Sequence, residues 1–184
     1  LTTYIDTIAD DATPDLVTYK KTSLVIYDSI DRITSYKEYS VDNKLFLGTL
    51  PTFLESYLTY TQRQNITYDI NNNILSYQDT VISPTSTDGL TKITITTTRS
   101  DMAYDSAYNQ LIGYKDIITS SATPDLITTK TINNISYDLL ARQTGYTETL
   151  ANNRLLQDAA ITVTQRSSIT YNDKNQVLSY NDHI

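Results

Sequence analysis

The feature that most constrains this chain is an internal repeat built around the dipeptide Tyr-Asp. The dipeptide begins at Tyr27, Tyr68, Tyr104 and Tyr137, and Tyr171 is followed by Asn at the next position in the series. Successive anchors lie 41, 36, 33 and 34 residues apart. Periods of this length are typical of chains that copy one supersecondary unit and bury a face between neighbouring copies. We therefore expect residues 1–184 to form a single continuous repeat array, with an insertion near residues 45–57.

A second tyrosine and an acidic residue complete each unit. The second tyrosine follows the anchor after nine residues in four units and after ten in the unit of Tyr104. The acidic residue comes two positions later, at Glu38, Asp79, Asp116, Glu148 and Asp182. The predicted structural positions of the repeat are Tyr27, Tyr36, Tyr68, Tyr77, Tyr104, Tyr114, Tyr137, Tyr146, Tyr171 and Tyr180.

A longer register lies over the shorter one. A shift of 110 residues aligns residues 1–38 with residues 111–148 without a gap. In this alignment Ala12–Leu16 and Ala122–Leu126 are identical. The shift spans three units, which indicates that an ancestral duplication copied three units together.

The nine-residue spacing predicts a β-hairpin in each unit. If the two tyrosines face each other across the turn, a two-residue loop remains between the strands. Such loops favour type I′ and II′ turns, whose positive φ angles suit Asn, Asp and Gly. The extra residue before Tyr114 indicates a three-residue loop or a bulge in that unit. The predicted loops are Asp31-Arg32, Asn72-Asn73, Ala141-Arg142 and Asn175-Gln176, of which Ala141 fits least well.

Composition favours strands along the whole chain. Thr and Tyr suit a pleated, half-buried surface, whereas the good helix formers Ala, Glu, Met and Arg are scarce. We predict an all-β fold, a repetitive antiparallel hairpin meander of about eleven strands that stack or coil as an array. Wider turns containing Thr-Pro-Asp-Leu or Ser-Pro-Thr-Ser-Thr-Asp-Gly are expected between hairpins. Outgoing strands are expected near residues 2–8, 33–39, 74–82, 111–118, 143–149 and 177–183, and returning strands near 16–28, 58–69, 92–105, 127–138 and 161–172.

Strand alternation assigns residues to the two faces of the sheet. The anchor tyrosine shares a face with the residue two positions before it, and we predict that this face is buried. On the opposite face Asp28 is expected to bond Ser35, and Asp69 to bond Ser76. Arg63, Arg99 and Arg166 all lie five residues before an anchor and predict a ladder with acidic positions of neighbouring units. The residues predicted on the buried face beside the tyrosines are Val25, Ile66, Met102, Ile135 and Ile169.

Charge and hydropathy exclude two classes of partner. The net charge is −7 and the chain contains no cluster of Lys and Arg, so we expect no binding to nucleic acid. No apolar run approaches the roughly 18 residues of a membrane span. The absence of Cys excludes disulfides and thiolate metal sites without fixing the compartment.

The inventory of catalytic side chains is poor. The single histidine, His183, lies one residue from the end of the sequence, whereas a Ser-His-Asp or Cys-His site needs a positioned imidazole. Paired carboxylates for glycoside hydrolysis and oxygen ligands for Ca²⁺ at Asp10, Asp11 and Asp15, or at Asp88 near Asp79, remain alternatives. Solvated acidic turns explain these carboxylates better, so we predict no enzyme activity, no cofactor and no metal site.

The repeated unit resembles the YD repeat of Rhs and teneurin-type proteins, whose usual core is Tyr-Asp-x-x-Gly-Arg-Leu. Residues Tyr27–Ile33 are the most similar copy, and Tyr137–Arg142 keeps the arginine with Gln143 in place of leucine. The turn glycine is missing in every unit, and the period is longer than is usual in that family. The resemblance implies a long sheet of hairpins that coils into a shell or forms a stalk in very large secreted or surface proteins, with a scaffolding role.

These observations predict a structural or adhesive repeat segment of an extracellular fibre, stalk or surface layer, secreted or held at the cell surface. An outgoing strand without its own returning strand stands at each end of the sequence. The two strands predict either continuation of a longer array or head-to-tail self-association through strand edges. The alternative function is a module that binds polysaccharide along a stripe of Tyr or Thr. An enzyme with a shallow carboxylate site is a third, weaker reading.

Overall fold

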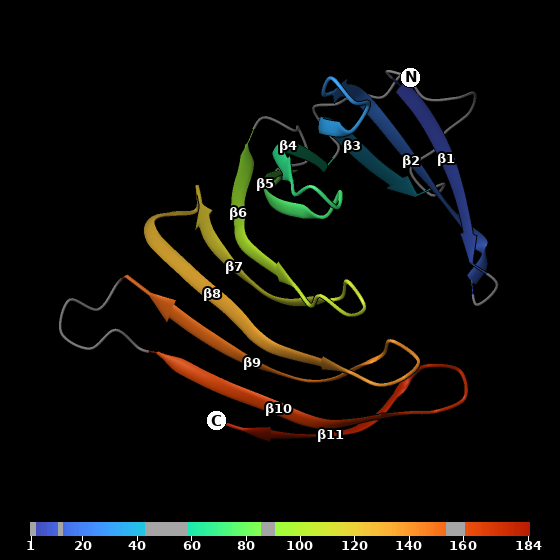
Figure 1. Ribbon diagram of the computed structural model, residues 1–184. Coiled ribbons are helices and arrows are strands. Elements are labelled where there is room, and N and C mark those ends of the chain that lie inside the picture. The colour runs from blue at the N-terminus through green and yellow to red at the C-terminus, as the bar shows by residue number, and fades with distance from the viewer. Residues whose placement is uncertain (1–2, 11–12, 43–58, 86–90, 154–160) are drawn as a thin grey trace. The chain divides into compact units, whose positions relative to one another are not determined.

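The computed structural model describes residues 3–10, 13–42, 59–85, 91–153 and 161–184 (Figure 1). These ranges contain eleven strands that follow one another in chain order in one antiparallel sheet, so the predicted all-β meander is confirmed. The predicted insertion at residues 45–57 lies outside the described ranges. The strands are β1 (Thr3–Asp10), β2 (Thr13–Tyr27), β3 (Ile33–Asp42), β4 (Tyr60–Tyr68), β5 (Ile74–Pro84), β6 (Lys92–Tyr104), β7 (Leu111–Ser120), β8 (Thr123–Tyr137), β9 (Gln143–Asn152), β10 (Thr162–Tyr171) and β11 (Val177–His183).

The chain packs as two compact parts, each larger than one repeat unit. The first comprises Leu1–Thr67, Tyr77–Thr96 and Ser120–Ala122, and among its described residues Val25, Tyr39 and Ile66 are buried. The second comprises Tyr68–Ser76, Thr97–Thr119 and Thr123–Ile184, and it buries Ile132 and Ile135.

Every hairpin turn is longer than predicted. In the first, the Asp28 amide donates to the Arg32 carbonyl over 2.8 Å, and Asp31 adopts a φ of 62°. The loop therefore has three residues, the form in which a type I turn precedes one left-handed residue. The predicted two-residue loops are wrong. Asn72, Ala141 and Asn175 hold the same left-handed position, and the unit of Tyr104 has a four-residue loop that ends at Asn109.

A bulge stands at one position of each returning strand. Ser23 pairs with Lys37 and Ile26 pairs with Ser35, so the returning strand contains one extra residue between these pairs. A left-handed residue lies three positions before every anchor tyrosine, which is typical of a β-bulge. These residues are Leu24, Asn65, Asp101, Asn134 and Ser168, with φ between 53° and 57°.

The turn lies closer to the anchor tyrosine than predicted, which changes the register of the hairpin. Tyr27 pairs with Ile33, and Tyr137 pairs with Gln143, six residues further along. The prediction that tyrosines nine residues apart face each other is therefore wrong, although they remain in one hairpin. Tyr36 instead pairs with Arg63, on the strand that follows.

The buried face is mainly aliphatic. Val25, Ile66 and Ile135, each two residues before an anchor, are at most 9% exposed, as predicted, whereas Met102 and Ile169 are half-buried. Tyr27 is 38% exposed, so the anchor tyrosine there is not a core residue.

The segment Thr-Pro-Asp-Leu does not form the predicted wide turn. It begins strand β2 at Thr13 and strand β8 at Thr123, and the turn before β8 is formed by Ser121 and Ala122. Proline is tolerated near the start of a strand because the ladder there needs few amide donors.

Candidate functional site

The polar side chains of the repeat form three sets of contacts, of which the first closes the turns. The residue after each anchor accepts bonds from its own loop. The Asp28 carboxylate accepts from the amides of Ile30 and Arg32 over 3.0 and 2.9 Å and from Arg32 Nε over 2.7 Å. Asp138 makes the equivalent bonds with Leu140 and Arg142. Asp, like Asn, is favoured here because its oxygen replaces a backbone acceptor in a turn.

This capping arrangement overturns one prediction. Asp28 was expected to bond Ser35, but Ser35 lies opposite Ile26 while both Asp28 oxygens accept bonds in the turn. Asp69 likewise accepts bonds from its own turn, from the amides of Asn71 and Asn73. In Asp28 the backbone bond from Arg32, opposed by desolvation, holds the pKa of the carboxyl below its ordinary value.

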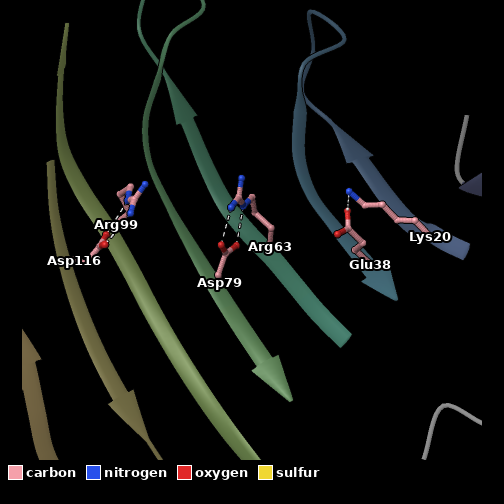
Figure 2. A network of polar contacts seen from close by, with 6 residues as sticks. All are labelled: Lys20, Glu38, Arg63, Asp79, Arg99 and Asp116. Atoms are coloured by element: carbon pink, nitrogen blue, oxygen red, sulfur yellow. Dashed lines mark hydrogen bonds and ion pairs between the residues drawn. The ribbon is translucent and has the colours of Figure 1, made fainter. Parts of the chain in front are cut away.

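The second set of contacts is a cation–carboxylate pair in each of the five repeat units. Figure 2 shows the pairs Lys20–Glu38, Arg63–Asp79 and Arg99–Asp116. Where the position five residues before the anchor is arginine, the guanidinium binds the acidic residue of the same hairpin through two bonds. Arg63 donates to Asp79 over 2.7 and 2.6 Å. Arg99 with Asp116, and Arg166 with Asp182, are bound in the same bidentate way. The predicted arginine ladder exists, but its acidic partners lie in the same unit and not in neighbouring units.

The other two hairpins contain a lysine–glutamate pair. Lys20 Nζ lies 2.8 Å from Glu38, and Lys130 Nζ lies 2.8 Å from Glu148. Glu38 is directly opposite Thr22, so Lys20 reaches it along the diagonal from two residues earlier. Arg166, in contrast, is directly opposite Asp182. The longer glutamate thus accompanies the more distant cation, and the shorter aspartate accompanies the arginine.

Aromatic rings enclose the arginines. The Arg63 guanidinium carbon lies 3.8 Å from the ring centre of Tyr77 in its own hairpin and 5.9 Å from that of Tyr36 on the preceding strand. Arg166 lies between Tyr180 and Tyr146 at 3.6 and 5.8 Å. A guanidinium stacks well on aromatic faces, and it retains its in-plane donors for the carboxylate. In these two cases the second tyrosine of one repeat unit contacts the arginine of the next.

The third set of contacts joins the hairpins of Tyr104, Tyr137 and Tyr171 to the hairpin before each of them. The anchor hydroxyls of Tyr104, Tyr137 and Tyr171 donate to the carbonyls of Ile74, Leu111 and Gln143 over 2.8, 2.7 and 2.6 Å. Each acceptor is the first residue of the preceding outgoing strand. Neighbouring turns also touch, because the side-chain amides of Asn73 and Asn109 exchange two bonds of 2.7 Å.

Sequence reasoning missed two parts of this arrangement. The lysine–glutamate pairs had a signal, because Lys20 and Lys130 occur only in the units that have Thr22 or Ile132 in place of arginine. The bulge had a weaker sequence signal, since Asn and Asp tolerate a left-handed conformation better than most residues. Leu24 gives no such signal.

The candidate catalytic and metal-binding residues are not assembled into a site within the described ranges. His183 ends the exposed strand β11, and Asp79 binds Arg63. The described residues contain no group of three or more metal-binding side chains. Asp11 and Asp88, as well as the side chains of Asp10 and Asp15, lie outside what the structure describes. A search of the same residues for helices found none long and apolar enough to cross a membrane.

The chain was compared with protein-family models, with curated proteins and with solved structures, and nothing matches it significantly.

Proposed function

We propose that this chain is a structural or adhesive repeat segment of an extracellular fibre, stalk or surface layer, which associates through the edges of its terminal strands. The observation that carries the proposal is that successive hairpins reuse the same contacts, namely a capped turn, a cation–carboxylate pair and a tyrosine bond to the preceding strand. Contacts between neighbouring copies are what give a repeat array its stability. Such a design suits a mechanical role.

The contacts that arginines make with the tyrosine rings and the carboxylates favour a scaffold over a ligand-binding surface. The rings of Tyr77, Tyr114 and Tyr180 are each covered by an arginine at 3.6 to 3.8 Å, so one face of each is not available to stack on a sugar. The carboxylates of Asp79 and Asp116 are held by arginines, which occupies the groups that a glycosidase would need.

Local geometry also supports descent from a YD-type repeat. The YD pattern has glycine at the fourth residue after the tyrosine. In this chain Asp31 and Ala141 stand there with φ values of 62° and 60°, a conformation that glycine adopts without strain. The aspartate and arginine of the motif bond each other in the turn. A YD-type origin would favour a secreted or surface location.

The edge strands supply the means of association. Among the described strands β1 pairs with β2 alone and β11 pairs with β10 alone, so each of them has one edge without a partner there. Every residue of β11 is exposed, including Val177 at 53% and Leu178 at 66%. Exposed apolar edges recruit further strands unless they are blocked by charge or proline.

Sedimentation velocity over a range of concentrations, combined with electron microscopy, tests the proposal. We expect concentration-dependent assemblies that persist at high salt, because backbone pairing and apolar contact are weakly screened. Leu178→Lys should abolish them by placing a charge on the β11 edge. Ile70→Lys, at a turn residue that is 96% exposed, is the matched control and should assemble like the parent chain.

A chain that stays monomeric at every concentration would overturn the self-association, as would equal loss of assembly in both variants. Saturable binding of a polysaccharide by the monomer, lost on a Tyr→Ala change at one repeated position, would support the alternative function.

A further inference from the structure

We propose that the outer edge of β11 is a docking site for an antiparallel β-strand that carries arginine five residues before tyrosine. The proposal rests on the function proposed above, in which strand edges make the contacts, and it specifies the partner's chemistry. The partner is a polypeptide segment of the same type as β4, β6 and β10.

The chain itself shows how the outer edge of an outgoing strand is covered. β3 is covered by β4, with Tyr36 opposite Arg63, and β9 is covered by β10, with Tyr146 opposite Arg166. The covering strands share a pattern, because Arg63, Arg99 and Arg166 are each followed by tyrosine after five residues. In β4 and β10 the two residues before the arginine are Thr-Gln in both.

The covering strand makes two specific side-chain contacts. In the pair of β9 and β10, Arg166 lies 5.8 Å from the Tyr146 ring centre, and the Tyr171 hydroxyl donates to the Gln143 carbonyl over 2.6 Å. Tyr137 makes the same bond to Leu111 in the preceding pair of hairpins. An arginine contact and a tyrosine bond, set five residues apart, therefore accompany the backbone ladder.

β11 presents both receiving groups in the same arrangement. Tyr180 occupies the position of Tyr146, and Val177 occupies the position of Gln143. Tyr180 is 48% exposed, with Arg166 on one side of its ring at 3.6 Å. The ladder bond from the Asn172 amide goes to the Gln176 carbonyl, so alternation along the strand directs the next carbonyl, that of Val177, to the outer edge. The outer edge of β11 thus matches the covered edge of β9.

β4, β6 and β10 are each paired on both sides in the sheet, so a second copy would have to open its own ladder to donate one of them. A second copy can reach this edge only with a terminal strand, as in the association proposed above. A strand with the arginine and tyrosine pattern therefore comes from outside these 184 residues and competes with that association. Backbone bonds would provide most of its affinity, and the arginine and tyrosine would set the register and the specificity.

The experiment uses a fluorescent peptide with the sequence of Thr162–Tyr171, titrated with the full 184-residue chain at concentrations where the chain is monomeric. Fluorescence anisotropy should show saturable binding. Replacing the peptide residue Arg166→Ala, or the chain residue Tyr180→Ala, should weaken binding about tenfold, the effect of losing one good cation–π contact. Tyr108→Ala in the chain is the matched control, because Tyr108 is 78% exposed in a turn and lies away from the edge.

Equal binding of a scrambled peptide, or no effect of Tyr180→Ala, would overturn the proposal. So would a peptide that fails to bind while labelled chain binds unlabelled chain through Tyr180, since the edge would then receive a second copy. Failure of the proposed function looks different. If the chain never self-associates but still binds the peptide, the proposed self-association is wrong and the proposed docking site stands.

Discussion

Asp116 and Asp182 occupy the same repeat position, and each accepts two bonds from an arginine, yet they differ in burial. The Asp116 side chain is 7% exposed, whereas that of Asp182 is 27% exposed. Removing one partner of an ion pair is costly where water cannot solvate the remaining charge, and much less so near the surface. The two sites therefore separate the effect of burial from that of bonding geometry.

We expect Asp116→Asn to lower the free energy of unfolding by about 3 kcal/mol, because the substituted side chain is buried and the Arg99 guanidinium beside it loses its counter-charge. Asp182→Asn should have a clearly smaller effect. Denaturant unfolding of the two variants and the parent chain measures the difference. Equal losses at the two positions would show that burial does not control the strength of these pairs.

At the scale of the strands, the bulges explain a column of small residues. The residue before the second tyrosine is Gly113 in β7 and Gly145 in β9, and serine in the other three units. A Cβ at Gly113 would lie 2.9 Å from the Ile132 carbonyl oxygen, and one at Gly145 would lie 2.9 Å from the Arg166 carbonyl oxygen. Both contacts are with the backbone of the following strand, just before its bulge. The following strand can approach this closely only because glycine has no side chain.

Gly113→Ala should therefore destabilise the chain by about 1–3 kcal/mol, the usual effect of overpacking against backbone that cannot move away. Ser35→Ala is the control, because serine already places a Cβ at the equivalent position, and its effect should stay within about 0.5 kcal/mol. Thermal and denaturant unfolding would measure both. A neutral Gly113→Ala would mean that strands β7 and β8 can separate without loss of pairing.

The strands could be predicted from the sequence because tyrosine spacing and alternation locate them independently of the exact register. The pairing within each hairpin could not. The bulge at positions such as Asn65 adds a residue to the returning strand, and the three-residue loop displaces the turn. Only the assumption that tyrosines face each other fixed the predicted register, and no residue in the sequence tests that assumption. The Arg63–Asp79 contact was predicted only in part. Both residues were identified, but the arginine was expected to pair with an acidic residue of a neighbouring unit.

At the scale of the whole molecule, the capped turns make stability depend on pH. Backbone bonds from Arg32, Tyr108 and Arg142 are the largest influences that lower the carboxyl pKa values of Asp28, Asp105 and Asp138. A carboxyl whose pKa is lower in the folded state stabilises the fold above its ordinary pKa. That contribution disappears as the pH falls through the folded-state value.

The triple variant Asp28→Asn, Asp105→Asn and Asp138→Asn should be less stable than the parent at neutral pH, with the difference shrinking in acid. Asparagine is a suitable replacement because Asn172 already accepts bonds from the Lys174 and Gln176 amides in its turn. Melting temperatures measured from neutral pH to below pH 3, with NMR titration of the three carboxyls, check the sign. A stability difference between the triple variant and the parent that stays constant with pH would contradict this prediction.

The strand count has a consequence for assemblies. The described residues form eleven strands in one antiparallel order, so β1 and β11 have the same sense in the strand order. Two copies that show the same face and meet through β11 and β1 would therefore join by a parallel ladder. Rotation about an axis normal to the sheet instead brings β11 against β11, or β1 against β1, in antiparallel fashion, and each of these two-fold contacts joins only two copies. A filament built head to tail would therefore carry one parallel ladder per copy, whereas a filament that alternates the two kinds of two-fold contact would be antiparallel throughout.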